Sequence, residues 1–442
     1  MTQCDDRASA VNRRRREVRG TAGSLARGCL CSNLLRLRAF REPQSLEQAP
    51  GTLIVPGQAQ RRLQFEGWRF IHHSYALVAQ AHCLCLLRRG DIDLRFRDLP
   101  YYYPTWKTTG GLVAPEDERA LATLRAPEAE FLPEATFSMR AEESDFTAAR
   151  SGRKFVFGTP EYRILGDRQR GGLSSGAELP DAIDIVTPSQ WCVAAYERFG
   201  IPSSRIHVVP HGIDPVVLHA DAASRAAARA ALNIDDHQLV FLSVGAMTPN
   251  KGIDLLLAAF ARLAASDPDV RLLLKGADGL YPSRDFVQAA LDELSSAARD
   301  AVVRRMIYTG GTYSSAKMAD LYRAADVYAA PYRAEGFNLP VLEAAACGVP
   351  VICTSGGPTD DFTDPACCGR IRSARYRPRL SDERVGDALA PDPEHLFELM
   401  AAAARERDAW RSMGERGAAH VHRHFSWSAV TDRLVSCLFA AV

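Results

Sequence analysis

The sequence predicts an α/β protein with two domains in series, each a parallel sheet covered by helices on both faces. The chain has 442 residues, more than one ordinary hydrophobic core fills. In its second half, short and nearly continuously apolar segments alternate with amphipathic ones, as strands of a parallel sheet alternate with their crossover helices. Between the halves, residues 205–215 (RIHVVPHGIDP) contain two prolines and a glycine and predict a linker.

The first domain is predicted over residues 61–213. A strand at 61–71, a helix at 74–90 and a strand at 92–100 form a β–α–β unit. Residues 110–150 are rich in proline and acids, which indicates loop with a short helix. The remaining expected elements are strands at 154–160 and 182–190, and a helix at 191–200 capped by Ser189 and ended by Gly200.

The second domain is predicted over residues 214–424 and has the more regular pattern. Its expected strands are 239–247, 270–277, 305–311, 327–331 and 349–357, and its expected helices are 250–266, 285–302, 315–326 and 338–348. Two such domains make a double Rossmann-like architecture. Ligands of these sheets bind beyond the carboxyl ends of the strands, and a cleft between the domains is the natural site.

The composition excludes several classes of protein. Hydrophobic residues make up 47% and charged residues 24% of the chain, and the formal net charge is +1. These values are typical of a soluble globular protein and argue against a dedicated nucleic-acid binder. No apolar segment approaches the roughly 18–20 residues of a membrane span, and no signal-peptide core is visible. We expect a cytoplasmic protein with at most peripheral contact to a membrane, and leave its oligomeric state open.

Residues 1–60 differ from the rest in charge and pattern. They contain ten Arg, no Lys and five acidic residues, and show no sustained periodicity. We interpret them as a disordered basic extension, or as upstream sequence from a misplaced start codon. A basic arm that touches anionic lipid is the functional alternative. Asp5, Asp6 and Glu17 count against an organellar transit peptide.

The chain has eleven cysteines. Two CxC spacings and the adjacent Cys367/Cys368 lack the matching ligands that a zinc site needs. A disulfide framework is typical of small secreted chains. We therefore expect reduced cysteines and no metal.

Two glutamates, Glu335 and Glu343, stand eight positions apart in the otherwise apolar segment PYRAEGFNLPVLEAAACGVPVI (331–352). Carboxylates in such segments need compensation. The pattern places Glu335 on the loop after a strand and Glu343 about one turn into a helix that starts near Asn338 and Leu339. Free N–H groups at that helix start would attract a phosphate, while the carboxylates accept hydrogen bonds from hydroxyls. A ligand in which hydroxyl groups flank a phosphate is a nucleotide sugar, with ribose on one side and a hexose on the other.

The segment EGFNLPVLEAAACGVPVI (335–352) closely resembles the EGFGLPxLEAMACGxPVI signature of retaining glycosyltransferases with two Rossmann domains, the GT-B fold, in family 4. The resemblance extends to VVPHGID (208–214) and SVGAMTPNKGIDLLLAAF (243–260). It is good over residues 180–365, loose over 65–180 and absent before that. It implies a GT-B fold whose last helix, within the amphipathic tail 425–442, packs back on the first domain.

The resemblance also assigns roles to residues. Glu343 would bind the ribose hydroxyls of the donor nucleotide, Glu335 would hold hydroxyls of the donor sugar, and Lys251 would neutralise the diphosphate. Tyr313, after a strand end, would lie where the family contacts the base. The backbone of the loop would contact the sugar and diphosphate through Gly336, Phe337, Asn338 and Leu339. A lysine and a helix N-terminus can stabilise the leaving diphosphate without a metal, so no cofactor is expected.

Two departures from the family pattern stand out. Ala246 occupies the position of a usual arginine that helps the lysine on the phosphates, and Arg333 is a candidate replacement. The first-domain turn GWRFIHHS is poor in glycine. In that turn, His73 and Ser74 are candidates to contact the donor phosphate or the acceptor hydroxyl, with a structural turn as the alternative for His73.

Other residues near predicted strand ends receive weaker assignments. Segments 160–163 (PEYR) and 187–191 (TPSQW) could reach the cleft, and His211 and Asp214 are expected to shape the hinge. The adjacent acids at 360–361 are not a metal-binding DxD pattern.

The sequence thus predicts a retaining glycosyltransferase that moves a sugar from a nucleotide-diphosphate donor to a hydroxyl acceptor on a glycan, lipid or small molecule. Its candidate catalytic residues are Glu335, Lys251 and His73. A non-catalytic nucleotide- or glycan-binding relative is the alternative, favoured by Ala246. A Rossmann oxidoreductase is disfavoured because no GxGxxG follows the first strand. The donor sugar, base and acceptor stay open.

Overall fold

The structure, a computed structural model, describes residues 60–141, 143–380 and 384–440. The predicted extension at 1–60 lies outside the described residues, apart from Gln60. Both large sheets lie within one compact unit of the chain, to which residues 379–385 do not belong. The predicted domain boundaries at 213 and 424 stay predictions.

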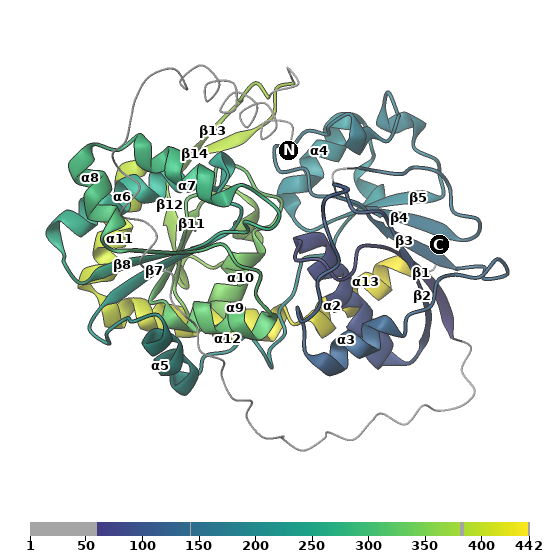
Figure 1. The fold of residues 1–442 in the computed structure, drawn as a ribbon. Coiled ribbons are helices and arrows are strands. Elements are labelled where there is room, and N and C mark those ends of the chain that lie inside the picture. The colour runs from purple at the N-terminus through teal and green to yellow at the C-terminus, as the bar shows by residue number, and fades with distance from the viewer. Residues whose placement is uncertain (1–59, 142, 381–383, 441–442) are drawn as a thin grey trace, which may run out of the picture. The chain divides into compact units, whose positions relative to one another are not determined.

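The first sheet has six parallel strands in the order β2-β1-β3-β4-β5-β6 (Figure 1). The strands are β1 (Arg61–Gly67), β2 (Ile92–Asp98), β3 (Ala135–Met139), β4 (Arg153–Phe157), β5 (Ile183–Thr187) and β6 (Ile206–Val208). The helices are α2 (Ser74–Arg89), α3 (Pro115–Ala122) and α4 (Gln190–Phe199), with 3-10 turns at Arg168–Arg170, Gly176–Glu178 and Ser203–Arg205.

The sequence interpretation was wrong about two of these strands. β3 lies within 110–150, where only loop and a short helix were expected, and all of its residues are buried. Thr136 and Ser138 interrupt its apolar pattern, although the strand is central and pairs with both β1 and β4. β6 lies inside the predicted linker, because both prolines of that segment follow it and leave its backbone free to pair with β5.

The second sheet also has six parallel strands, in the order β12-β11-β10-β7-β8-β9. The strands are β7 (Leu239–Val244), β8 (Val270–Lys275), β9 (Met306–Thr309), β10 (Val327–Ala330), β11 (Val351–Thr354) and β12 (Cys368–Ile371). A separate antiparallel pair is β13 (Ser373–Tyr376) and β14 (Ala388–Pro391). The strand–helix alternation predicted for this half is confirmed.

Helices cover both faces of the second sheet. They are α5 (Ala222–Ala231), α6 (Ile253–Ser266), α7 (Ser283–Asp292), α8 (Ser296–Val303), α9 (Ser315–Ala324), α10 (Leu339–Ala346), α11 (Pro393–Arg405) and α12 (Arg407–His424), with 3-10 turns at Pro249–Lys251 and Pro358–Asp361. One helix was predicted over 285–302, but the chain breaks there. Ser295 starts α8 by accepting a hydrogen bond from the Ala298 N–H (3.4 Å).

The two faces of the second sheet bury different cores. Val240 and Leu242 of β7 pack in a cluster with α9 and α10, whereas Leu239 and Phe241 pack in a cluster with α6 and α11. This alternation follows from the two-residue period of a strand. It is the reason why the strands read as continuously apolar.

The last helix, α13 (Trp427–Leu438), packs beside α2 of the first domain (Figure 1). Its Val430 and Leu434 are fully buried in the core that holds β1 and β2. The His82 Nδ1 atom of α2 lies 2.9 Å from the Thr431 hydroxyl, and burial lowers the pKa of His82 to about 3. The predicted return of the C-terminal helix to the first domain is therefore confirmed.

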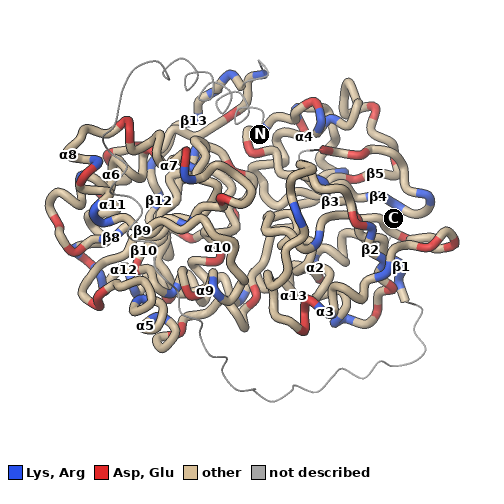
Figure 2. The backbone as a smooth tube through the Cα atoms, in the orientation of Figure 1, with Lys and Arg blue, Asp and Glu red and all other residues tan. Residues whose placement is uncertain are grey.

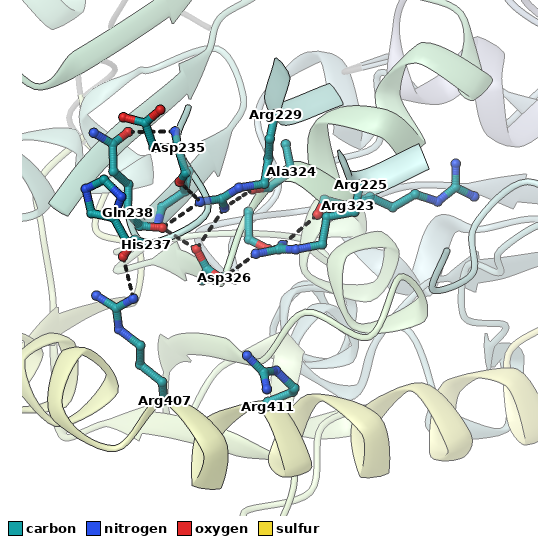
Figure 3. A network of polar contacts seen from close by, with 12 residues as sticks. Arg225, Arg229, Asp235, His237, Gln238, Arg323, Ala324, Asp326, Arg407 and Arg411 are labelled. Atoms are coloured by element: carbon teal, nitrogen blue, oxygen red, sulfur yellow. Dashed lines mark hydrogen bonds and ion pairs between the residues drawn. The ribbon is translucent and has the colours of Figure 1, made fainter. Parts of the chain in front are cut away.

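A buried polar network joins α5 to the starts of β7 and β10 (Figure 3). Arg229 is 2% exposed and donates to Asp326 and to the carbonyls of Ala324, Asp235 and Gln238. Asp326 also accepts from Arg225 (2.6 Å) and from the Val240 N–H (2.8 Å). One carboxylate thus compensates a buried guanidinium and fixes the amino-terminal edge of the sheet.

Charges of both signs are interspersed along the described chain (Figure 2). This pattern agrees with the near-neutral net charge. Within the described ranges, no helix is both long and apolar enough to cross a membrane.

Candidate functional site

The loops that follow β7 and β10 form the centre of the candidate site. In the second sheet β8 and β9 lie to one side of β7, while β10, β11 and β12 lie to the other, so the strand order reverses between β7 and β10. Ligands of doubly wound sheets bind at such a switch point, beyond the carboxyl ends of the strands. Lys251 follows β7 and Glu335 follows β10, so both predicted residues lie at this edge.

A close approach of two backbones brings these loops together. Gly252, directly after Lys251, has φ +70°, and a Cβ atom there would lie 2.0 Å from the Pro331 carbonyl oxygen. Only glycine fits this position. Asn250 adds a second link, because its carbonyl accepts from the Arg333 N–H (2.7 Å) and its side-chain amide donates to the Ala334 carbonyl (3.1 Å).

Lys251 and Glu335 form an ion pair at this edge. Glu335 is 4% exposed, and the Lys251 side chain is 29% exposed. Burial would lower the pKa of Lys251, but Glu335 and then Glu161 outweigh it, so that this pKa is raised. Burial raises the pKa of Glu335, Lys251 opposes that rise, and Glu161 adds to it. Lys251 therefore carries its charge at neutral pH, between acids of the two domains.

Arg333, the candidate replacement for the missing arginine, is held elsewhere. Its guanidinium makes two hydrogen bonds to Asp254 of α6 (2.7 and 2.6 Å) and one to the Pro249 carbonyl (2.8 Å). These contacts brace the loop that carries Lys251. Arg333 therefore supports this loop. Its guanidinium is engaged there and does not replace the arginine missing at Ala246.

The start of α10 has free backbone donors, as predicted. Asn338 adopts a left-handed conformation (φ 73°) and its side chain makes no cap hydrogen bond. In the described part of the chain, the N–H groups of Phe337 and Asn338 have no hydrogen-bond acceptor. The Gly336 carbonyl accepts a hydrogen bond from the Ser189 hydroxyl (2.6 Å). The helix itself begins at Leu339. The helix start can therefore offer N–H groups to an anion.

Ser189 shows a further difference from the sequence interpretation. It stands at the N-cap position of α4, yet its hydroxyl does not cap that helix. Instead it binds the loop of the second domain at Gly336, and the neighbouring Cys192 thiol lies 3.3 Å from the same carbonyl. The competing acceptor, far away in sequence, could not be foreseen from the local pattern.

Glu343 lies on α10 and accepts a hydrogen bond from the Tyr322 hydroxyl (2.6 Å). Burial raises the pKa of Glu343 to about 7, and the bond from Tyr322 opposes the rise. Tyr313 lies in the loop after β9, half-buried, with its hydroxyl 2.5 Å from that of Thr309. Glu343 and Tyr313, the two residues predicted to contact the nucleotide, thus both lie on the side of the sheet that α9 and α10 cover.

Changing Glu343 to Gln is expected to alter how stability depends on pH. The folded-state pKa of Glu343 is raised from 4.5 to about 7, so as the pH rises the unfolded chain loses this proton first. The free energy of unfolding therefore falls between these two pKa values, by at most about 3 kcal/mol from this group. Urea unfolding at pH 5 and pH 7.5 should show a smaller decrease in the variant than in the wild type. Equal decreases would contradict the raised pKa.

His73 has both ring nitrogens engaged. Its Nδ1 atom accepts from the Tyr75 N–H (3.2 Å) and caps α2, and its Nε2 atom lies 3.2 Å from the hydroxyl of Tyr281, in the loop after β8. Burial, followed by the neighbouring His72, lowers the pKa of His73 to about 4. His73 is thus a neutral residue that joins loops of the two domains. Ser74, the first residue of α2, is exposed.

Both first-domain segments predicted to reach the cleft contact loops of the second domain. In segment 160–163, the Glu161 carboxylate accepts from the Asn250 amide (3.0 Å), next to Lys251. In segment 187–191, Ser189 contacts Gly336. The sequence placed these segments at strand ends but did not single out Glu161. His211 of the linker packs edge-on against Phe337 (4.7 Å between ring centroids).

The acid pair after β11 is engaged within the chain. Asp360 binds Arg370 (3.1 Å) and the Gly356 N–H (2.8 Å), and Asp361 accepts from the Gln190 N–H of α4 (2.6 Å). Within the described ranges, no group of three or more His, Cys, Asp and Glu residues is arranged to hold a metal ion.

Comparison with known proteins bears on this geometry. Residues 224–373 match the sequence model of the family described as glycosyl transferases group 1. This part of the chain is therefore similar to group 1 glycosyltransferases. This match spans the loops after β7 and β10 and the whole of α10. The resemblance noted from the motifs is therefore confirmed.

Several curated relatives have one name in common. The D-inositol 3-phosphate glycosyltransferase of Segniliparus rotundus is 33% identical over 247 residues, which are 56% of this chain and 49% of that protein. The enzyme of the same name from Kineococcus radiotolerans is 32% identical over 298 residues, 64% of this chain and 61% of that protein. The chain thus spans about half the length of the curated relatives that it matches.

Solved structures share the fold at low sequence identity. Sucrose-phosphate synthase from Thermosynechococcus elongatus has a TM-score of 0.61 and 18% identity, covering 87% of this chain and 100% of its own. Anabaena Alr3699/HepE in complex with UDP-glucose has a TM-score of 0.59 and 14% identity, covering 86% and 100%. Together with the two parallel six-stranded sheets, these neighbours identify the fold as GT-B.

Proposed function

We propose that this protein is a retaining glycosyltransferase that takes a sugar from a nucleotide-diphosphate donor and passes it to a hydroxyl acceptor. The observation that carries the proposal is the meeting of a charged lysine, a buried glutamate and free N–H groups at the switch point of the second sheet. Lys251 and the N–H groups of Phe337 and Asn338 suit a diphosphate, and Glu335 suits the hydroxyls of the attached sugar.

In the proposed reaction, the role of these residues is to stabilise the charge that develops on the leaving group. The bond between the anomeric carbon and the diphosphate oxygen breaks, and the oxygen takes the bonding electrons. Lys251 and the start of α10 would stabilise that negative charge, and Glu335, released from Lys251, would hold the sugar in place. The acceptor oxygen attacks from the face that the diphosphate leaves and transfers its proton to a diphosphate oxygen. Configuration at the anomeric carbon is thereby retained without a covalent intermediate, a metal or a cofactor.

The similar proteins suggest which substrates to test first. The curated relatives are named for D-inositol 3-phosphate, and one structural neighbour binds UDP-glucose. We propose to screen UDP-, GDP- and ADP-sugars with D-inositol 3-phosphate among the acceptors, detecting products by mass spectrometry. Transfer to any hydroxyl acceptor supports the proposal. Binding of a donor without turnover across the panel would overturn the enzymatic assignment.

A non-catalytic nucleotide- or glycan-binding protein is the second candidate. Ala246 favours it, because the position beside Gly245 lacks the cation that the family pattern supplies to the phosphates. The two functions differ in one measurement, since only the enzyme consumes a donor that it binds.

Changing Glu343 to Ala is expected to lower nucleoside diphosphate affinity roughly ten- to a hundredfold, because hydrogen bonds to a charged group are worth about 1.5–3 kcal/mol. Isothermal titration calorimetry measures this directly. Glu293→Ala, which removes an exposed acid near the end of α7, is the matched control and should bind like the wild type. A Glu343→Ala variant that binds as tightly as the wild type would refute the ribose assignment.

A further inference from the structure

Lys275 is a buried cation next to the position that lacks one. It is the last residue of β8 and pairs in register with Val244, the last residue of β7. Its carbonyl accepts from the Gly245 N–H (3.0 Å), so its backbone adjoins the loop that carries Ala246. The side chain is only 1% exposed. A lysine is rarely buried to this extent without an ion-pair partner.

The polar partners of Lys275 do not satisfy its ammonium. Of its three N–H donors, one reaches the Gly276 carbonyl (2.5 Å), and no carboxylate within the described residues lies at ion-pair distance. Asp278, in the following loop, raises the pKa of Lys275 from a distance but is bound to Tyr308 and Arg284. Burial outweighs it and lowers that pKa to about 8, which keeps the lysine charged at neutral pH.

The other cations at this edge of the sheet are already paired. Lys251 is bound to Glu335, and Arg333 is bound to Asp254. A second cation would strengthen the binding of a diphosphate beyond what Lys251 alone supplies, because hydrogen bonds between charged groups are the strong ones. Of the three, Lys275 is the cation without a carboxylate at ion-pair distance among the described residues.

The side chain of Lys275 lies on the face of the sheet that holds the candidate site. Residues two apart in a strand share a face, and Leu273 packs with Tyr322 and Leu342 in the core under α9 and α10. The Lys275 ammonium accordingly lies 5.2 Å from the ring centroid of Tyr313, the predicted base contact. Burial, and after it the charge of Lys275, lowers the pKa of His72, which lies in the turn before α2 of the first domain.

We infer that Lys275 is the second cation of the donor site and binds the phosphates of a nucleoside diphosphate in place of the arginine missing at Ala246. Tyr313, whose ring faces its ammonium, and His72, whose pKa it influences, both come from loops. A donor that enters between these loops can reach the ammonium by displacing one ring. This inference rests on the proposed function and adds to it a residue outside the family motifs.

Calorimetric titration of Lys275→Met tests the inference. The wild type is first titrated with UDP, GDP and ADP, and the tightest binder is used together with its nucleoside. The variant is expected to bind the diphosphate roughly ten- to a hundredfold more weakly and the nucleoside with unchanged affinity, because only the diphosphate presents charge to the lysine. Lys317→Met is the matched control, since this exposed lysine lies 4.2 Å from the same Tyr313 ring.

Two further variants separate binding from folding. In Lys275→Met/Ala246→Arg, the restored arginine should recover most of the lost affinity for the diphosphate. Lys275→Arg keeps the charge and should lose less affinity than Lys275→Met, whatever the effect of either on thermal stability. An equal loss for nucleoside and diphosphate, no loss, or an equal loss in Lys317→Met would overturn the inference. If the wild type binds no nucleotide, the proposed function itself fails, which is a different outcome.

Discussion

Changing Lys251 to Met is expected to lower kcat/KM for sugar transfer roughly a hundred- to a thousandfold, the usual effect of removing one group that stabilises a developing oxyanion. Lys251 is the charged side chain at the switch point whose pKa is raised by Glu335 and Glu161 against the effect of burial. The loss should appear mainly in kcat, because the charge on the diphosphate grows as its bond to the sugar breaks. Steady-state kinetics with the best donor measures both constants.

A double variant controls for damage to the fold. Removing Lys251 alone leaves Glu335, 4% exposed, without its cation, so this acid should take up a proton or destabilise the loop. Lys251→Met/Glu335→Gln removes the unpaired acid and should restore thermal stability, while its activity stays far below that of Glu335→Gln alone. Recovery of activity together with stability would show that Lys251 has only a structural role.

Changing Asp326 to Ala is expected to lower the free energy of unfolding by about 3–5 kcal/mol, the cost of leaving a buried ion uncompensated. The loss falls on Arg229, which is 2% exposed, and on the Val240 N–H that Asp326 also satisfies (Figure 3). Urea unfolding at neutral pH gives the difference, provided that the transition has one step.

Asp320→Ala is the matched control for this prediction. Asp320 pairs with Arg323 along α9 (3.2 Å), but its side chain is 49% exposed, so its removal should cost less than about 1 kcal/mol. Similar losses in the two variants would contradict the special position of Asp326. Arg229→Met in the Asp326→Ala background should recover part of the stability, because it removes the uncompensated charge.

The sequence predicted five of the six strands of the second sheet, all except β12, because their signals are local. Apolar runs, a proline at the start of α10 and glycines at turns fix each strand and helix without reference to distant residues. The same signals placed Glu335 on a loop and Glu343 on a helix, where the structure has them. The break between α7 and α8 at Ser295 was missed because the apolar spacing continues across it.

Contacts between distant residues could not be predicted in the same way. Lys251 and Glu335 are 84 positions apart, and Arg333 and Asp254 are 79 apart. Which side chains pair depends on the order of the strands in the sheet. No local sequence pattern indicates that β10, β7 and β8 are neighbours in this order. Lys275 can be noticed in the sequence, because it is a lysine at the end of an otherwise apolar strand. Its proximity to Ala246 could not be predicted without knowing that β8 pairs with β7.

The most direct test of a nucleotide-diphosphate site at the switch point is isothermal titration of UDP, GDP and ADP into the wild type and Glu343→Ala. We predict that one of the three binds the wild type with one site per chain, with a dissociation constant of roughly 1 μM–1 mM, the range of enzyme KM values. Its affinity for the variant should be at least tenfold lower. Absence of binding by all three at millimolar concentration would contradict the proposed function.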